Sequence, residues 1–157
     1  MKLTKLFFFA FLGLSVSLPG FADKDPNLKL IEARKGEMQL RSFNAGPLFG
    51  MAKGKIEYNA ELAASAANNL KTLMALDMGR AWPEGTGNDN YPDATRALPA
   101  IWSNYSDLVG YAEDYAKAVN DLAANAGNGV DALKANIGAL GQSCKGCHDD
   151  MRAKKKK

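Results

Sequence analysis

The stretch GQSCKGCHDDMRAKKKK, residues 141–157, holds both cysteines and the only histidine of the chain. Cys144, Cys147 and His148 fall within five consecutive positions, so two thiols and one imidazole lie close together. Upstream of them, apolar residues recur every three or four positions back to Val130, which is the spacing of an amphipathic helix. The sequence therefore predicts a helix over 130–148 whose last turns carry three reactive side chains.

Four kinds of site use a Cys-x-x-Cys pair. A disulfide across so short a loop would constrain little of the unfolded chain. A thiol–disulfide redox motif accompanies a βαβ pattern, which is not visible here, and one histidine is too few for the usual four-ligand zinc site. Cys-x-x-Cys-His uses all three residues, because the thiols form thioethers to a haem and the imidazole ligates its iron. The sequence therefore predicts one covalently attached haem c on Cys144, Cys147 and His148.

Three further amphipathic helices are predicted upstream by the same spacing, over residues 30–52, 59–78 and 101–122. Asn59 is the expected N-cap of the second helix, and Pro47 is expected to kink or loosen the first. A turn at 53–58, a long Gly- and Pro-rich loop at 80–97 and the turn NAGNG at 125–129 separate the helices. Two short connections and one long one predict an all-α fold, an antiparallel four-helix bundle.

The first 22 residues have the features of a secretory signal peptide. Lys2 and Lys5 precede an uncharged, mostly apolar run over 6–18, and Gly20 and Ala22 are the small residues of a cleavage site. The apolar run is shorter than the roughly 20 residues that a membrane-spanning helix needs. We therefore predict a signal peptide at 1–22, export to the periplasm and no membrane span after its removal.

Residues 23–157 have the length of one domain with one core. The formal net charge of the whole chain is +3, and removal of the signal-peptide lysines lowers it, so attraction to nucleic acid is not expected. The lysines at 154–157 are interpreted as a solvated helix end, where cations suit the helix dipole, with a docking patch as the alternative.

The sequence leaves several candidates for the second axial position of the iron. The chain has no second histidine, so methionine, lysine, water or an open position remain. The methionines after residue 22 are Met38, Met51, Met74, Met78 and Met151. Met151 lies three residues after His148 on the same predicted helix and cannot reach the opposite face of the haem. A methionine ligand must therefore come from far upstream.

These features together resemble class II cytochromes c, the cytochrome c′ family. The resemblance rests on a signal peptide, four helices and the motif CKGCHDDMR at 144–152. The segments EARKGEM (32–38), AKGK (52–55) and PAIW (99–102) support it. The resemblance covers essentially all of 23–157 and implies a four-helix haem domain there, although Pro47 departs from the uninterrupted first helix of the family.

The resemblance implies roles for three residues outside the haem motif. Arg34 matches an arginine near a haem propionate, Met38 the residue that faces the distal side of the iron, and Arg152 an arginine close to the proximal histidine. Arg34 and Met38 are four positions apart and share one otherwise apolar helix face, where a buried arginine needs an anion such as a propionate. A methionine on an apolar stripe can also be core packing.

Met38 decides between two predicted functions. With Met38 on the iron, the protein belongs to the low-spin branch and transfers electrons to and from periplasmic redox proteins; this is our main prediction. The alternative is a five-coordinate cytochrome c′, or one whose Met38 is displaced, that binds NO or CO and sequesters nitric oxide. An enzyme such as a peroxidase is not expected, because no distal histidine is available for acid–base chemistry. The resemblance also implies a homodimer through the first two helices, which the sequence leaves open.

Overall fold

The computed structural model describes residues 25–155 of the chain. The predicted signal peptide at 1–22 and the last two lysines, 156 and 157, lie outside this range. None of the helices within it is long and apolar enough to cross a membrane.

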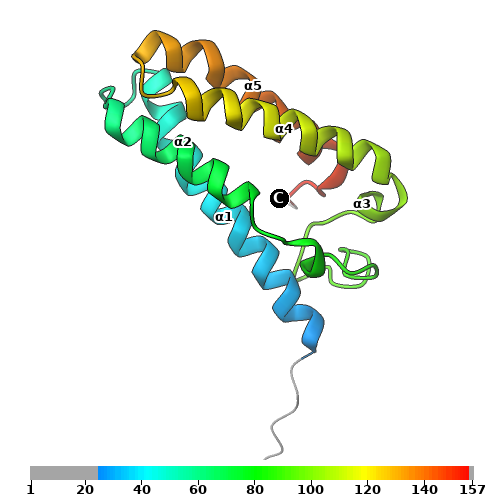
Figure 1. Ribbon diagram of the computed structural model, residues 1–157. Coiled ribbons are helices and arrows are strands. Elements are labelled where there is room, and N and C mark those ends of the chain that lie inside the picture. The colour runs from blue at the N-terminus through cyan, green and yellow to red at the C-terminus, as the bar shows by residue number, and fades with distance from the viewer. Residues whose placement is uncertain (1–24, 156–157) are drawn as a thin grey trace, which may run out of the picture.

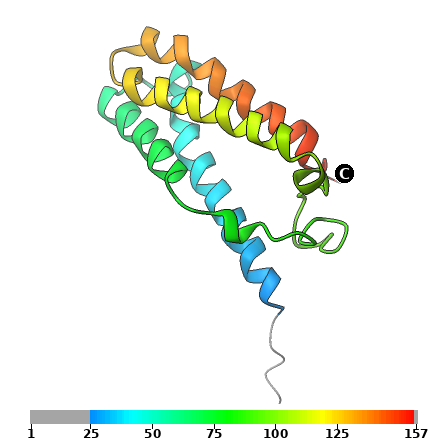
Figure 2. The ribbon, with the colours of Figure 1, turned by 45° about the vertical axis from the view of Figure 1, so that its right-hand side comes forward.

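Four long helices run antiparallel to their neighbours and form a bundle (Figures 1 and 2). The elements in chain order are α1 (Pro26–Ala52), α2 (Ala60–Met74), the 3-10 turn η1 (Gly79–Ala81), the short α3 (Ala100–Ser103), α4 (Tyr105–Asn125) and α5 (Val130–Met151). Helix α5 packs against α4 and α1, and α2 packs against α1 and α4. The predicted all-α four-helix bundle is therefore confirmed.

The helix ends follow from local sequence. The Asp25 side chain accepts a hydrogen bond from the backbone N–H of Asn27 at 2.9 Å, and Pro26 at the first helical position needs no N–H partner. Asn59 caps α2 as predicted, since its side chain accepts from the N–H of Leu62 at 2.8 Å. Gly129 precedes α5 with φ of 113°, a conformation that favours glycine.

Three predicted details of the helices are wrong. Helix α1 continues through Pro47 without interruption, because the carbonyl that Pro47 leaves unbonded belongs to Phe43, a highly exposed residue that water can reach. Helix α2 ends at Met74 rather than near 78, where Asp77 instead accepts from the N–H of Gly79 at 3.1 Å. The third predicted helix is split at Asn104, whose φ of −115° and ψ of 54° are not helical.

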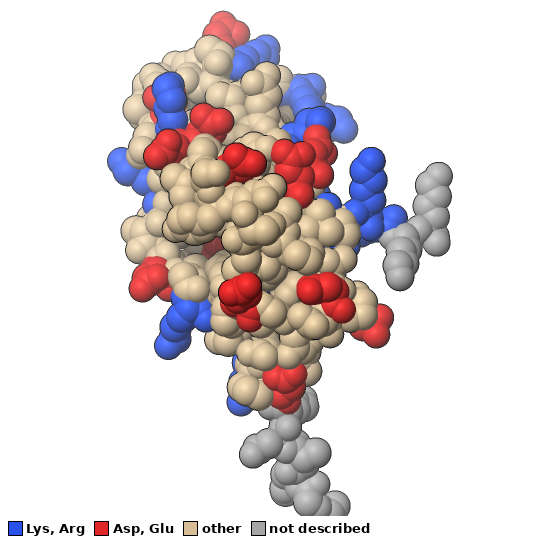
Figure 3. Space-filling view, turned by 90° about the vertical axis from the view of Figure 1, so that its right-hand side faces the viewer, with Lys and Arg blue, Asp and Glu red and all other residues tan. Residues whose placement is uncertain are grey.

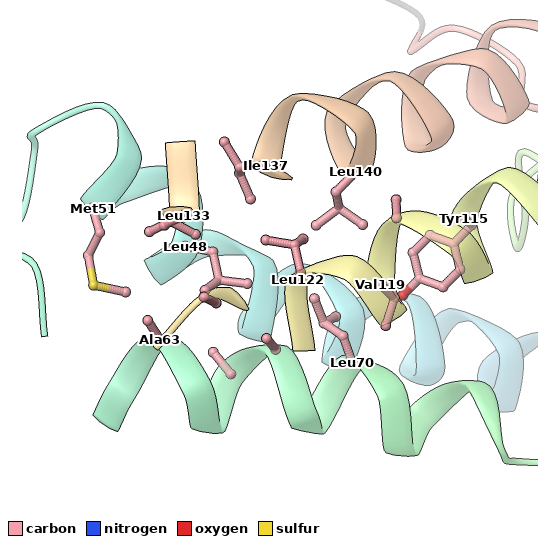
Figure 4. Packing of buried hydrophobic residues seen from close by; sticks show 14 residues of the cluster. Leu48, Met51, Ala63, Leu70, Tyr115, Val119, Leu122, Leu133, Ile137 and Leu140 are labelled. Carbon is pink, nitrogen blue, oxygen red and sulfur yellow. The ribbon is translucent and has the colours of Figure 1, made fainter. Parts of the chain in front are cut away.

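Most buried apolar side chains form one cluster inside the bundle, which we call the main cluster (Figure 4). Its members are Leu48, Met51, Ala63, Ala66, Ala67, Leu70, Tyr115, Ala118, Val119, Leu122, Ala126, Leu133, Ile137 and Leu140. Every long helix contributes to it. The contribution of α2 consists of three alanines and one leucine, and these small side chains let α2 approach its neighbours closely.

A second, smaller cluster lies where the long loop meets the end of α5. Its buried members are Ala97, Ile101 and Met151, and Trp82, Ala100, Trp102, Leu108, Tyr111 and Cys147 pack against them. We call this the second cluster. The indole N–H of Trp102 donates to the carbonyl of Trp82 at 3.0 Å, which fastens α3 to the loop.

Charged side chains are scattered over the surface at the α3 side of the molecule (Figure 3). Acidic side chains are spread across this face, and most of its Lys and Arg side chains lie toward the margins. The face therefore presents no broad basic patch.

Candidate haem site

The Cys-x-x-Cys-His motif lies in the last turns of α5, which remains helical through Met151. Cys144, Cys147 and His148 are therefore spaced so that all three occupy one face of the helix. Both thiols are free, and all three side chains are half-buried. Two thiols and an imidazole on a single face fit the covalent attachment and proximal ligation of a haem c.

Burial sets the protonation of these groups. Burial raises the pKa of the Cys144 thiol. The pKa of the Cys147 thiol is also raised, chiefly by burial and secondly by the charge of Cys144. Burial and the nearby positive charges of Arg152 and Arg96 lower the pKa of His148. The imidazole is therefore biased toward its neutral form, which is the form that ligates a metal.

The motif joins the two apolar clusters. Cys144 packs against the main cluster, and Cys147 packs against the second cluster. A group bound to both thiols would therefore lie between the main cluster and the second cluster.

Polar contacts hold the end of α5 in place. The Tyr111 hydroxyl of α4 donates to the Asp150 carboxylate, and a side chain at Gly146 would approach the Tyr111 ring to 3.1 Å. Glycine at this position of the motif therefore allows α4 and α5 to pack closely. After Met151, Ala97 and Arg152 form an isolated antiparallel bridge, so the predicted site residue Arg152 is fixed at the end of α5 near His148.

Arg34 is buried, with 2% of its surface exposed, but its partners differ from those expected. Its guanidinium donates to the Thr86 hydroxyl at 2.7 Å and the Thr86 carbonyl at 2.5 Å, and more weakly to the Ala81 carbonyl and the Thr95 hydroxyl at 3.4 and 3.3 Å. It also lies 4.5 Å from the centroid of the Trp82 ring. Loop carbonyls, hydroxyls and an aromatic face therefore satisfy the buried Arg34, and its place near a haem propionate stays a prediction.

Met38 lies on α1, three residues before Arg41. The charge of Arg41 lowers the pKa of both Cys144 and Cys147, which places Arg41 near them. Met38 keeps 38% of its surface exposed, whereas Met51 and Met151 are almost completely buried. Met38 belongs to neither apolar cluster, and its place on the distal side of the iron stays a prediction.

Sequence reasoning missed three polar residues near the motif and wrongly described this face of α1 as otherwise apolar. Glu37 is 5% exposed and forms an ion pair with Arg41, four positions later. The Arg41 guanidinium lies 4.5 Å from the centroid of the Tyr115 ring on α4. The four-residue spacing of Glu37 and Arg41 was a visible signal, but it does not show that the pair faces inward.

An all-α bundle whose last helix ends in Cys-x-x-Cys-His belongs to the class of c-type haem-binding proteins. The family model described as Cytochrome C' matches residues 29–152, so the chain belongs to the cytochrome c′ family.

Known members of the family match most of the chain. A cytochrome c′ of Cereibacter sphaeroides is 36% identical over 142 residues, which cover 90% of this chain and 95% of the relative. A solved cytochrome c′ from "Rhodobacter Spheriodes" is 36% identical with a TM-score of 0.81, covering 83% of this chain and all of that one. A ferrous variant of cytochrome c′ from Alcaligenes xylosoxidans with bound NO is 27% identical with a TM-score of 0.68, covering 81% of this chain and 97% of that one.

Proposed function

We propose that the chain is a haem protein that binds NO or CO and sequesters nitric oxide. Cys144 and Cys147 would hold the haem and His148 would ligate its iron, which supplies the gas-binding chemistry. Membership of the cytochrome c′ family and a solved relative with bound NO support this function. They favour it over our main prediction of a permanently methionine-ligated electron carrier.

The observation that carries the proposal is the match of residues 29–152 to the family model described as Cytochrome C', beside a solved relative that holds NO. Met38 belongs to neither apolar cluster, so neither cluster fixes its thioether in one place. We therefore propose that Met38 is a pocket residue, or a weak ligand that a gas displaces.

Optical spectra of the purified holoprotein test this proposal. We expect the reduced wild type to change its spectrum on addition of CO and of NO, and a Met38→Leu variant to do so faster. A wild type that ignores CO beside a Met38→Leu variant that binds it would show that Met38 holds the iron, and would restore the electron-transfer function. Failure of both proteins to bind CO would overturn the gas-binding function.

Periplasmic location and exchange of electrons with other periplasmic proteins are part of the proposal. The features of residues 1–22 support export, and a haem iron outside the cytoplasm can exchange electrons with proteins of that compartment. N-terminal sequencing of the protein from a periplasmic extract should give a chain that begins after Ala22. An intact residue 1 in that fraction would contradict the predicted cleavage.

We also propose that the protein forms a homodimer through α1 and α2. Leu40 and Phe43 on α1 and Leu62 on α2 are exposed apolar residues, and Phe43 is 76% exposed. A Phe43→Asp variant should halve the molar mass measured by light scattering. Tyr105→Asp changes an exposed aromatic residue on α4 and is the matched control, which should leave the mass unchanged.

A further inference from the structure

A group of cations lies at the end of α5, where the chain leaves the bundle. The antiparallel bridge between Ala97 and Arg152 brings the end of the long loop beside the residues that follow the haem motif. It thereby gathers four cations, which we call the tail patch: Arg96, Arg152, Lys154 and Lys155. Arg96 is half-buried, and the other three are exposed. The lysines come after the end of α5 at Met151, so the bridge rather than a helix determines where they lie.

Backbone bonds on both sides of the bridge fix the tail patch. The N–H of Ala153 donates to the Arg96 carbonyl at 2.8 Å, and the N–H of Leu98 donates to the Met151 carbonyl at 2.9 Å. The Arg96 guanidinium also donates to the Ala153 carbonyl at 3.3 Å. Loop and tail therefore hold each other, and the patch keeps a fixed place relative to the end of α5.

No carboxylate within residues 25–155 forms an ion pair with the tail patch. The three ion pairs of this part of the chain involve other cations. The two acids that directly follow His148 are engaged elsewhere, since Asp149 pairs with Lys145 and Asp150 accepts from the Tyr111 hydroxyl. Like charges gathered without an acid repel one another, so the patch favours an anion from outside the chain.

The tail patch lies beside the predicted proximal histidine. Burial lowers the pKa of His148, and the charges of Arg152 and Arg96 lower it further, which places both arginines near the imidazole. Cys147 packs against the second cluster, whose buried members include Ala97 of the bridge. An anionic surface held by the patch would therefore lie close to the residues that hold the haem, and the path of an electron would be short.

The surroundings of the patch limit the kind of partner that it fits. Acidic side chains are spread across the α3 side of the molecule (Figure 3). A broad anionic surface, such as a membrane of acidic lipids, would meet these carboxylates together with the patch and would be repelled by them. A compact group of carboxylates on another protein can meet the four cations alone.

We propose that the tail patch docks redox proteins that present a compact group of Asp and Glu side chains, so that electrons reach the haem past the end of α5. This inference rests on the proposed exchange of electrons with periplasmic proteins, and it names the surface that would serve it. The patch orients the partner and speeds the encounter, because complementary charges steer association. Its effect should weaken as salt screens the charges.

The test measures how fast the reduced holoprotein gives one electron to ferricyanide, a small multiply charged anion that becomes ferrocyanide. The patch variant combines Arg96→Gln, Lys154→Gln and Lys155→Gln, and it leaves the predicted haem-site residues unchanged. We expect it to react about tenfold more slowly than the wild type at low salt and to approach the wild-type rate at high salt. A polyglutamate peptide should slow the wild type by competing for the patch and should leave the variant unaffected.

The matched control combines Lys53→Gln, Lys55→Gln and Lys134→Gln. These lysines belong to the α1–α2 turn and the start of α5, at the end of the bundle opposite α3 (Figure 1). The control loses the same formal charge, so it should slow much less than the patch variant if the patch itself attracts the anion.

Equal slowing of the control and the patch variant, or no slowing of the patch variant, would overturn the inference while the exchange of electrons stands. Vesicles of phosphatidylglycerol that bind the wild type but not the patch variant, beside a peptide that has no effect on oxidation, would assign the patch to a membrane and also overturn it. A reduced wild type that ferricyanide does not oxidise would overturn the proposed exchange of electrons and the inference together.

Discussion

The two apolar clusters are held together in different ways. The main cluster consists of fourteen buried residues, thirteen from the four long helices and Ala126 directly after α4. The second cluster has three buried residues and depends on loop segments and partly buried aromatic side chains. Polar contacts supplement it, namely those of Arg34 with Thr86, of Tyr111 with Asp150 and of Ala97 with Arg152. The main cluster is thus stabilised chiefly by apolar burial, whereas the small second cluster depends more on directed bonds.

The largest expected effect comes from removing the attachment points. Replacing both Cys144 and Cys147 by Ser should abolish covalent haem, because no thioether can form. Haem staining after denaturing electrophoresis and the mass of the chain measure this loss. Hydrogen exchange should then increase at the second cluster and remain slow in the main cluster. Covalent haem on the double variant, or equal loosening of both clusters, would contradict the comparison.

Cavity-forming substitutions should separate the two clusters by stability. Leu122→Ala removes a completely buried side chain from the main cluster and should lower the free energy of unfolding by about 3 kcal/mol. Ile101→Ala in the second cluster should cost less, because a small cluster beside loops can relax around the gap. Urea unfolding measures both, and equal losses would show that the second cluster is packed as rigidly as the first.

Loss of the Arg34 contacts should loosen the loop without affecting the bundle. Arg34→Met removes bonds to Thr86, Thr95 and the Ala81 carbonyl and should cost about 2 kcal/mol. Hydrogen exchange over 80–97 should rise, while α4 remains protected. Arg34→Lys keeps the charge but not the planar donor fork, so it should restore only part of the protection. A full rescue by lysine would mean that charge alone holds the loop.

Two glycines of α5 test the packing beside the motif on a smaller scale. Gly138 has open space around its Cα, so Gly138→Ala should stabilise the helix by up to about 1 kcal/mol. Gly146→Ala gains the same helix propensity but pushes the Tyr111 ring, which a Cβ would approach to 3.1 Å. It should therefore stabilise less, as measured by thermal unfolding. Equal gains would show that Tyr111 moves aside freely.

An effect confined to strongly alkaline conditions concerns the ionisation of Tyr115. The pKa of Tyr115 is raised from 10.0 to about 12 in the folded protein, chiefly by burial. Its contribution to stability is complete below the unfolded pKa and falls as pH rises toward 12, because only the unfolded state loses the proton. Urea unfolding at several pH values above 10 should therefore give a shallower decline for Tyr115→Phe than for wild type. An unchanged slope would contradict the burial of this hydroxyl.

The sequence was sufficient where one regular pattern determined the structure. Helical periodicity predicted the four long helices, and Asn59 was a correct N-cap. The sequence was insufficient where the hydrogen-bond partners of a side chain lie in irregular loops. The loop at 80–97 has no period, so nothing in it indicated that Thr86 and Thr95 would satisfy Arg34. Likewise, Tyr115 and Arg41 meet across two helices, and their contact depends on helix rotation that no local pattern specifies.

The bridge between Ala97 and Arg152 also determines how the molecule responds to mechanical load. Its two flanking backbone bonds run from the Ala153 N–H to the Arg96 carbonyl at 2.8 Å and from the Leu98 N–H to the Met151 carbonyl at 2.9 Å. We expect tension on the tail to open these two bonds in turn, beginning at Ala153, because that bond is nearest the tail. The helix that carries the thiols is thus shielded from a pull on the tail until both bonds have opened.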